Sequence, residues 1–267
     1  MSVLLQISDP HFGTERPPVM RALHELARRL RPELVVLSGD VTQRARGAQF
    51  EAARRFVDEL AAPAVLAIPG NHDIPLYNFA MRALLPYRNY RRAFGAELEP
   101  EFESEALQVT GVNTTRPGRH KNGAVSAGQV ARVARRLSMA AARQARIVVV
   151  HQPVHVIRRR DERNLLRGRE QAVRSWAAAG ADIVMGGHIH LPYVRSLDER
   201  YDGLPRRVWT VQAGTAVSTR VRGDIPNSVN VLRHPAGATE CLVERWDFDA
   251  AGAAFQCVTR DALILDR

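Results

Sequence analysis

The chain has 267 residues, 45% of them apolar, so it can bury a large core, and its length fits one α/β domain as well as two small ones. No stretch approaches the roughly 18 consecutive apolar residues of a membrane span, and the N-terminus shows neither a basic region nor a cleavage site. We therefore expect no membrane span and a cytoplasmic location.

The formal net charge of +10 is carried almost entirely by arginine, because Lys121 is the only lysine. A positive surface raises the local concentration of anionic substrates and would suit phosphate esters or nucleic acid. A composition rich in Ala and Arg is also typical of a GC-rich genome, in which solvated arginines on helix faces need no ligand. We favour this compositional explanation, so nucleic acid is a less favoured partner than a small phosphodiester.

Short apolar runs alternate with amphipathic segments over the first two thirds of the chain. The continuous apolar runs, typical of strands buried on both faces, cover residues 3–7, 34–38, 64–68, 147–150 and 182–186. The segments with apolar residues at helical spacing cover about 18–30, 48–61, 128–142 and 168–179. This alternation predicts an α/β sheet protein.

The pattern changes after residue 203, where apolar and polar residues alternate and turn residues such as Gly223 and Pro226 separate the segments. This pattern predicts antiparallel strands that extend a second sheet. Because no polar linker divides them from the rest, we expect a single domain over 1–267, with the C-terminal antiparallel strands from about 204.

Side chains of metal-binding type follow five of the predicted strands. They are Asp9 and His11, Asp40, Asn71, His151, and His188 with His190. Ligand crevices of open α/β sheets lie outside the carboxyl ends of the strands, so we expect these loops to converge. Two adjacent metal ions need about this many oxygen and imidazole ligands, which predicts a two-metal hydrolase. Each cluster alone is also compatible with turn or cap residues, but five in this order favour a site.

The ordered motifs SDPH, SGD, PGNHD, HQP and GGHIH resemble those of the calcineurin-like metallophosphoesterases, over residues 3 to about 190. Within that superfamily, SDPHFG and PGNHDIPLYN are most similar to bacterial class III cyclic-nucleotide phosphodiesterases. Pro10 departs from many relatives, but it lies between two ligand candidates and leaves their side chains in place. The resemblance implies a four-layer α/β/β/α sandwich, in which two packed β-sheets are flanked by helices.

The resemblance also implies two ligand sets that share Asp40. One metal would be held by Asp9, His11, Asp40 and His190, and the other by Asp40, Asn71, His151 and His188. A carboxylate has two oxygens with which to bridge the ions, whereas an imidazole has one available nitrogen. Water between two cations loses a proton easily and gives a hydroxide for in-line attack on phosphorus. Imidazole and oxygen ligands together favour Mn, Fe or Zn over Ca.

The resemblance makes His72, beside Asn71, the residue that faces the substrate. It would protonate the leaving oxygen or stabilise charge on the phosphoryl group, with Asp73 as its orienting partner. The alternative, a buried histidine bonded to its own loop, is less favoured.

Two polar loops offer further substrate contacts. Residues 113–123 contain Asn113 and Arg116, together with His120 and Lys121, as candidates to contact phosphate or base. Residues 158–174 could form a lid or an oligomer contact. For both loops a solvated charged surface is an equally good explanation.

The leading functional hypothesis is therefore metal-dependent hydrolysis of a phosphodiester, with a 3',5'-cyclic nucleotide such as cAMP as the favoured substrate. The enzymatic alternatives are a nuclease and a nucleotide-lipid pyrophosphatase or phosphomonoesterase. The non-enzymatic alternative is a metal-free binding scaffold, against which the complete ligand set argues.

Overall fold

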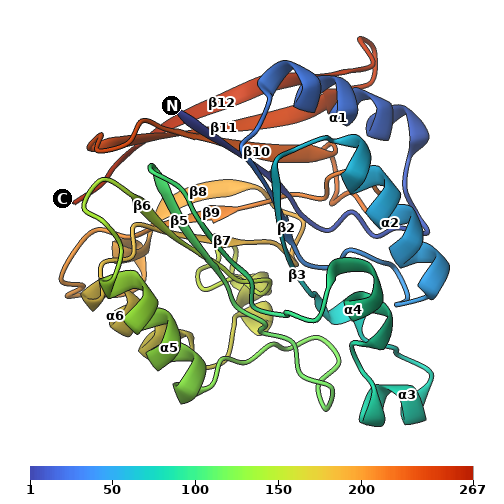
Figure 1. The fold of residues 1–267 in the computed structure, drawn as a ribbon, viewed down its shortest axis with the longest axis horizontal. Coiled ribbons are helices and arrows are strands. Elements are labelled where there is room, and N and C mark those ends of the chain that lie inside the picture. The colour runs from blue at the N-terminus through green and yellow to red at the C-terminus, as the bar shows by residue number, and fades with distance from the viewer. Residues whose placement is uncertain (267) are drawn as a thin grey trace.

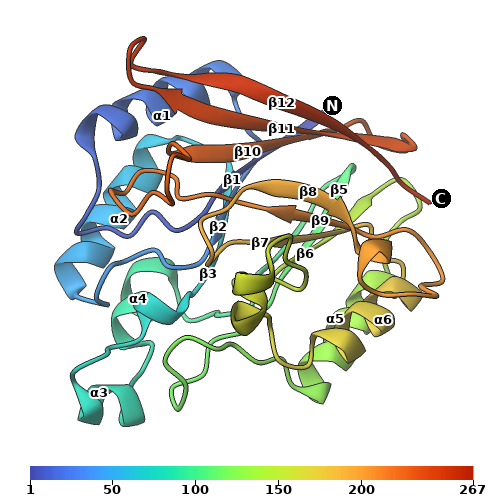
Figure 2. The same ribbon diagram turned by 180° about the vertical axis from the view of Figure 1, so that it is seen from behind.

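The computed structural model describes residues 1–266 and contains two six-stranded sheets packed against each other, with helices on their outer faces (Figures 1 and 2). The strand orders are β12-β11-β10-β1-β2-β3 and β4-β5-β6-β7-β9-β8. This arrangement confirms the expected fold class. No helix within these residues combines the length and the apolar character needed to traverse a bilayer.

The first sheet joins N-terminal parallel strands to C-terminal antiparallel strands. Its parallel part comprises β1 (Ser2–Ile7), β2 (Leu34–Ser38) and β3 (Ala64–Ile68). Its antiparallel part comprises β10 (Ser228–His234), β11 (Glu240–Asp249) and β12 (Ala254–Ile264). The sequence pattern predicts that the C-terminal strands extend a second sheet. In the structure β10, β11 and β12 instead extend the sheet that contains β1.

The second sheet is also mixed. It comprises β4 (Glu101–Glu103), β5 (Leu107–Gly111), β6 (Ala145–Val149), β7 (Ile183–Gly186), β8 (Tyr193–Ser196) and β9 (Trp209–Gln212). Strand β9 pairs in parallel with β7 and antiparallel with β8. The expectation of antiparallel strands after about residue 204 is therefore wrong for the pairing of β9 with β7. The chain passes from β7 to β8 at the edge of the sheet and then returns, so that β9 lies between them.

The helices cover the outer faces of the two sheets. Helices α1 (Pro17–Leu30) and α2 (Gly47–Glu59) lie against the first sheet, while α5 (Ala127–Ser138) and α6 (Arg169–Ala178) lie against the second (Figure 1). Helix α5 begins with a capping box, in which the Ser126 side chain accepts from the backbone N–H of Gln129. The predicted helices are confirmed, with ends that differ by up to four residues.

Several short elements lie near the loops. They are α3 (Phe79–Leu84), α4 (Arg88–Phe94) and the 3-10 helices η1 (Asn71–Asp73), η2 (Arg159–Asn164) and η3 (Leu197–Glu199). Helix α4 packs on α2 through Tyr90, whose ring centroid lies 6.0 Å from the ring centroid of Phe50. Helix α3 buries no residue and projects from the body of the molecule (Figure 2).

The core has three apolar layers. The layer between the sheets includes Leu4, Leu66, Val109, Ile147 and Met185, all of which are buried. The two outer layers lie beneath the helix pairs. Five of the strands are buried on both faces, namely β1, β2, β3, β6 and β7. The site lies at their carboxyl ends, where polar residues follow each strand.

Candidate metal centre

The backbone adopts a left-handed conformation at five of the seven predicted metal ligands. The φ angles are 49° at Asp9, 44° at His11, 47° at Asp40, 71° at His188 and 52° at His190. Non-glycine residues rarely adopt positive φ, and such strain persists where the surrounding structure imposes it, frequently at functional sites. Nine non-glycine residues within 1–266 have positive φ, so more than half of them are ligand candidates.

Two glycines allow the loops to approach the ligand candidates closely. A Cβ atom on Gly70 would collide with the backbone nitrogen and the carboxylate of Asp40. A Cβ atom on Gly187 would collide with the side chains of Ser8 and Asp9. These contacts explain why glycine precedes the ligand motifs at both positions.

The structure brings the predicted ligand side chains together in overlapping groups. Asp9, His11 and His190 offer ligand atoms within 4.8 Å of one another. The same holds for Asp40, His151 and His188 and for His11, Asp40 and His72. Asn71, the seventh predicted ligand, lines the same cavity. The five loops therefore converge as the sequence predicts.

Asp40 lies between the two sides of this cluster. Its Oδ1 is 3.3 Å from His151 Nε2, and its Oδ2 is 3.8 Å from His11 Nε2. On the far side of His11, the Nε2 atom of His190 lies 3.2 Å from His11 Nε2 and 3.2 Å from Asp9 Oδ1. The two oxygens of one buried carboxylate thus face two different groups of candidate ligands.

Several buried atoms at the centre have no hydrogen-bond partner within residues 1–266. They are Asp9 Oδ1, Asn71 Oδ1, His151 Nε2 and His188 Nδ1. A buried polar atom without a partner is costly, so convergent unpartnered lone pairs indicate a place for a cation. These nitrogen and oxygen donors fit Mn, Fe or Zn ions.

Hydrogen bonds to main-chain carbonyls orient two of the imidazoles. His151 Nδ1 donates to the carbonyl of Ser38 at 2.9 Å, and His190 Nδ1 donates to the carbonyl of Arg220 at 2.6 Å. Because Nδ1 carries the proton in each ring, Nε2 of the neutral ring presents its lone pair to the centre. This is the usual arrangement around histidines that bind metals.

Burial and mutual charges shift the titration of these groups. Burial alone would raise the pKa of Asp40, but His151 and His72 outweigh it and hold that pKa well below its usual range. Burial lowers the pKa of both His11 and His188 to about 3. The pKa of His151 rises to about 9, since Asp40 outweighs the opposing effect of burial. The centre thus contains an ionised carboxylate beside two imidazoles that stay neutral, His11 and His188, and a third, His151, whose protonated form Asp40 stabilises.

His72 faces the same cluster, with its ring centroid 4.9 Å from that of His11. Its Nδ1 lies 3.0 Å from the carbonyl oxygen of Gln43, and its Nε2 lies 3.2 Å from Arg220 Nη1. The expected orienting partner, Asp73, bonds elsewhere: its carboxylate accepts hydrogen bonds from residues of the neighbouring loops. Gln43 and Arg220, which the sequence did not single out, therefore take the positions around the His72 ring.

A cavity of about 550 Å³ opens over the cluster. Lys121 lines it from loop 113–123, and Arg160 and Arg163 line it from loop 158–174. Arg222 also lines it, and its Nη2 donates to both carboxylate oxygens of Asp161 at 2.9 Å. Both predicted polar loops thus contribute basic residues to the rim.

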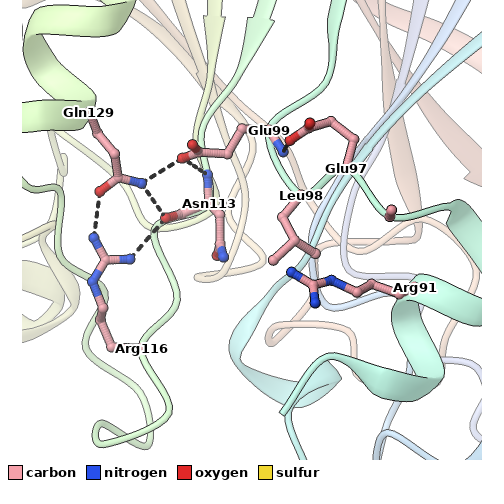
Figure 3. Close-up of a pocket in the computed structure, with 8 residues that line it drawn as sticks. Arg91, Glu97, Leu98, Glu99, Asn113, Arg116 and Gln129 are labelled. Atoms are coloured by element: carbon pink, nitrogen blue, oxygen red, sulfur yellow. Dashed lines mark hydrogen bonds between the residues drawn. The ribbon is translucent and has the colours of Figure 1, made fainter. Parts of the chain in front are cut away.

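Asn113 and Arg116 lie elsewhere. They line a separate cavity of about 470 Å³, shown in Figure 3, together with Arg91, Glu99 and Gln129. Arg116 donates to the carbonyl of Asn113 at 3.0 Å and to Gln129 Oε1 at 2.5 Å. The structure therefore does not bring these two predicted substrate contacts to the metal cluster.

Known structures share this fold. Vps29 from Chaetomium thermophilum superposes over 100% of both chains with a TM-score of 0.53 and 9% identity. Wild-type Vps29 complexed with Zn²⁺ from Entamoeba histolytica covers 98% of this chain and 99% of its own, with a TM-score of 0.50 and 14% identity. At these identities the similarity concerns the fold alone.

Sequence comparison gives the family. A probable cyclic nucleotide phosphodiesterase from Synechococcus sp. is 35% identical over 81 residues, which are 27% of this chain. The match spans only 31% of that relative's length. The model of the calcineurin-like phosphoesterase family matches residues 2–192, which include every predicted metal ligand. The chain therefore belongs to the calcineurin-like phosphoesterase family.

Proposed function

We propose that the protein is a metal-dependent phosphodiesterase with two metal sites, and that its substrate is a 3',5'-cyclic nucleotide such as cAMP. The position of Asp40 carries this proposal, because its two oxygens face two separate groups of candidate ligands. Family membership supports phosphoester hydrolysis, and the partial match to a probable cyclic nucleotide phosphodiesterase supports the choice of substrate.

The proposed ligand sets follow the grouping of the side chains. Asp9, His11, Asp40 and His190 would hold one ion, and Asp40, Asn71, His151 and His188 would hold the other. Metal ions bound there would polarise the phosphoryl oxygens and lower the pKa of water. The buried ligand side chains keep their lone pairs directed at the centre, and Ser8 Oγ and the His188 backbone N–H fix Asp9 by donating to its Oδ2 at 2.6 and 2.9 Å.

The size of the cavity favours a small substrate. About 550 Å³ lies within the range of cavities that enclose nucleotide-sized ligands. The rim residues Lys121, Arg160 and Arg163 form no ion pair with the part of the chain that the structure describes, so their charges are available to an anion. These cations also keep a substrate of higher charge than a cyclic nucleotide as the second candidate, either a nucleic acid or a nucleotide-lipid pyrophosphate.

A turnover panel tests the proposal. The protein is loaded in turn with Mn, Fe and Zn and assayed with cAMP, bis-nitrophenyl phosphate, a phosphomonoester, a UDP-lipid and single-stranded DNA. Asp40→Ala, prepared identically, controls for contaminating phosphatases. We expect turnover of the diesters, with cAMP preferred among the natural compounds. Absence of turnover with every metal would favour the scaffold alternative.

A further inference from the structure

Arg220 lies in the loop after β9, which is fixed to the first ligand motif. The Thr215 hydroxyl donates to the carbonyl of Asp9 at 2.6 Å. The carbonyl of Arg220 accepts the hydrogen bond from His190 Nδ1 at 2.6 Å. The main chain at Arg220 is therefore held directly against the candidate metal centre, and its position does not depend on its side chain.

The side chain of Arg220 contacts His72, which lines the same cavity. Its Nη1 lies 3.0 Å from Gln43 Oε1 and 3.2 Å from His72 Nε2. The Nδ1 atom of His72 lies 3.0 Å from the carbonyl oxygen of Gln43, and a carbonyl can only accept, so Nδ1 carries the ring proton. In the neutral ring Nε2 is then an acceptor for Arg220. Gln43 and His72 together fix the direction of one guanidinium nitrogen.

The remaining donors of this guanidinium have no acceptor in the described part of the chain. A guanidinium has five N–H groups, of which the two on Nη1 are directed to Gln43 and His72. The Nε and Nη2 groups of Arg220 have no hydrogen-bond partner within residues 1–266, and no carboxylate there pairs with it. Arg222, two residues on, is instead neutralised by Asp161. Arg220 is thus an unpaired cation on the wall of a cavity lined by ligand candidates.

We propose that Arg220 is a catalytic residue that binds the phosphoryl oxygens of the substrate, and that His72 and Gln43 position its guanidinium for this contact. The planar fork of arginine matches two phosphoryl oxygens at once. Donors fixed before charge develops contribute about 10²–10³-fold to kcat each. The inference rests on the proposed phosphodiesterase function and adds a residue outside both ligand sets. It makes His72 a positioning residue that acts through Arg220.

Substitutions at Arg220 test the contact. Arg220→Gln removes the charge, Arg220→Lys keeps the charge without the fork, and Arg159→Gln removes the same charge from an exposed residue of η2 outside the cavity. Metal equivalents, thermal midpoint, kcat and KM for bis-nitrophenyl phosphate, and calorimetric affinity for inorganic phosphate are measured on each metal-loaded protein. We expect Arg220→Gln to keep its metals, to lose about 10²–10³-fold in kcat/KM and to bind phosphate about tenfold more weakly. Arg220→Lys should be intermediate, and Arg159→Gln should match the wild type.

Two results would overturn the inference. One is that Arg220→Gln and Arg159→Gln have equal kcat/KM and equal affinity for phosphate, and the other is that the metal-loaded wild type does not bind phosphate. Phosphate affinity requires no turnover, so a protein that binds phosphate through Arg220 but hydrolyses nothing contradicts the proposed function alone. If Arg220→Gln does not fold, the phosphate affinity of Arg220→Lys decides.

A double-mutant cycle tests the positioning role of His72. If His72 acts through Arg220, His72→Ala should lower kcat/KM strongly in the wild type and by less than about threefold in the Arg220→Gln background. The KM for the diester should rise less than kcat falls, because the contact strengthens as charge develops. Multiplicative losses would show that the two residues act independently and would overturn this part of the inference.

Discussion

Asp73 and Thr42 are joined by two hydrogen bonds, since Asp73 Oδ1 accepts from the Thr42 backbone N–H at 2.8 Å and from its hydroxyl at 2.9 Å. The other carboxylate oxygen accepts from the backbone N–H groups of Val41 at 3.0 Å and Gly70 at 2.8 Å. Asp73 therefore ties the loop after β2, which carries Asp40, to the loop after β3. Burial and the nearby Asp40 raise the pKa of Asp73 to about 7, against the opposing effect of these donors.

Asp73→Asn is expected to destabilise the protein by about 1–3 kcal/mol, because the new amide NH₂ would face backbone donors and leave buried groups unsatisfied. Thr42→Ser is the matched control: it keeps the hydroxyl that donates to Asp73 Oδ1 and accepts from the Ala45 backbone N–H, so it removes only one buried methyl group and should cost about 0.8 kcal/mol. Urea unfolding of both variants measures the difference. Equal stabilities of Asp73→Asn and the wild type would show that these bonds do not link the loops.

The strand positions could be predicted from the sequence because each buried strand is a continuous apolar run. The predicted 34–38 and 64–68 coincide with β2 and β3. The division of these runs between two sheets could not be predicted, since strands buried on both faces look alike in either sheet. The pairing of β1 with β10, as in Ser2 opposite His234, joins the two ends of the chain and has no local signal. Helix α3 could not be predicted either, because it buries no residue and its sequence lacks the spaced apolar residues of an amphipathic helix.

The candidate site was predictable to a similar extent. The ligand motifs combine rare residue types with strand ends, so the sequence shows them directly. Gln43 contributes its main-chain carbonyl to His72 and its side-chain Oε1 to Arg220, and neither contact belongs to a motif. Arg220 is one arginine among many in a chain whose charge has a compositional explanation. The polar character of their loop predicts that Asn113 and Arg116 lie near the substrate, but the hydrogen bonds that hold them lie around another cavity.

Gly70→Ala is expected to disrupt the centre, because the added Cβ would collide with the backbone nitrogen and carboxylate of Asp40. Neither group can move without displacing candidate ligands, so metal content should fall and stability should decrease by about 1–3 kcal/mol from overpacking. Gly118→Ala is the control, since a Cβ there meets no atom within 4 Å. Metal analysis and thermal unfolding measure both effects. Full metal content in Gly70→Ala would contradict the close approach.

Asp40→Ala is expected to remove both metals, whereas Asp9→Ala or Asn71→Ala should mainly weaken one. The reason is the position of Asp40 between the two ligand groups. Metal equivalents per chain, determined by elemental analysis after dialysis, measure this directly. Asp58→Ala, which removes an exposed carboxylate on α2, controls for charge. Two retained equivalents in Asp40→Ala would show that Asp40 is not the bridge.

Salt dependence separates a small substrate from a polyanion. A cyclic nucleotide bears one charge, so its KM should change little between about 50 and 200 mM salt. Over the same range the binding of a polyanion weakens steeply. Single-stranded DNA binding, measured by fluorescence anisotropy, should be weak at roughly physiological salt. Tight DNA binding that weakens steeply with salt, accompanied by cleavage of the DNA, would support the nuclease alternative over cyclic-nucleotide hydrolysis.

The leaving group distinguishes the two roles that the family resemblance allows for His72. A general acid contributes about 10²–10⁴-fold, and mainly for a poor leaving group. In this structure His72 Nδ1 donates to the carbonyl of Gln43, and Nε2 accepts from Arg220, so the resting ring has no proton aimed at the leaving oxygen. We therefore expect His72→Ala to keep both metals and to slow a ribose ester and a nitrophenyl ester by similar factors. A much larger loss for the ribose ester, measured as single-turnover rates on both substrates, would assign His72 as the general acid instead.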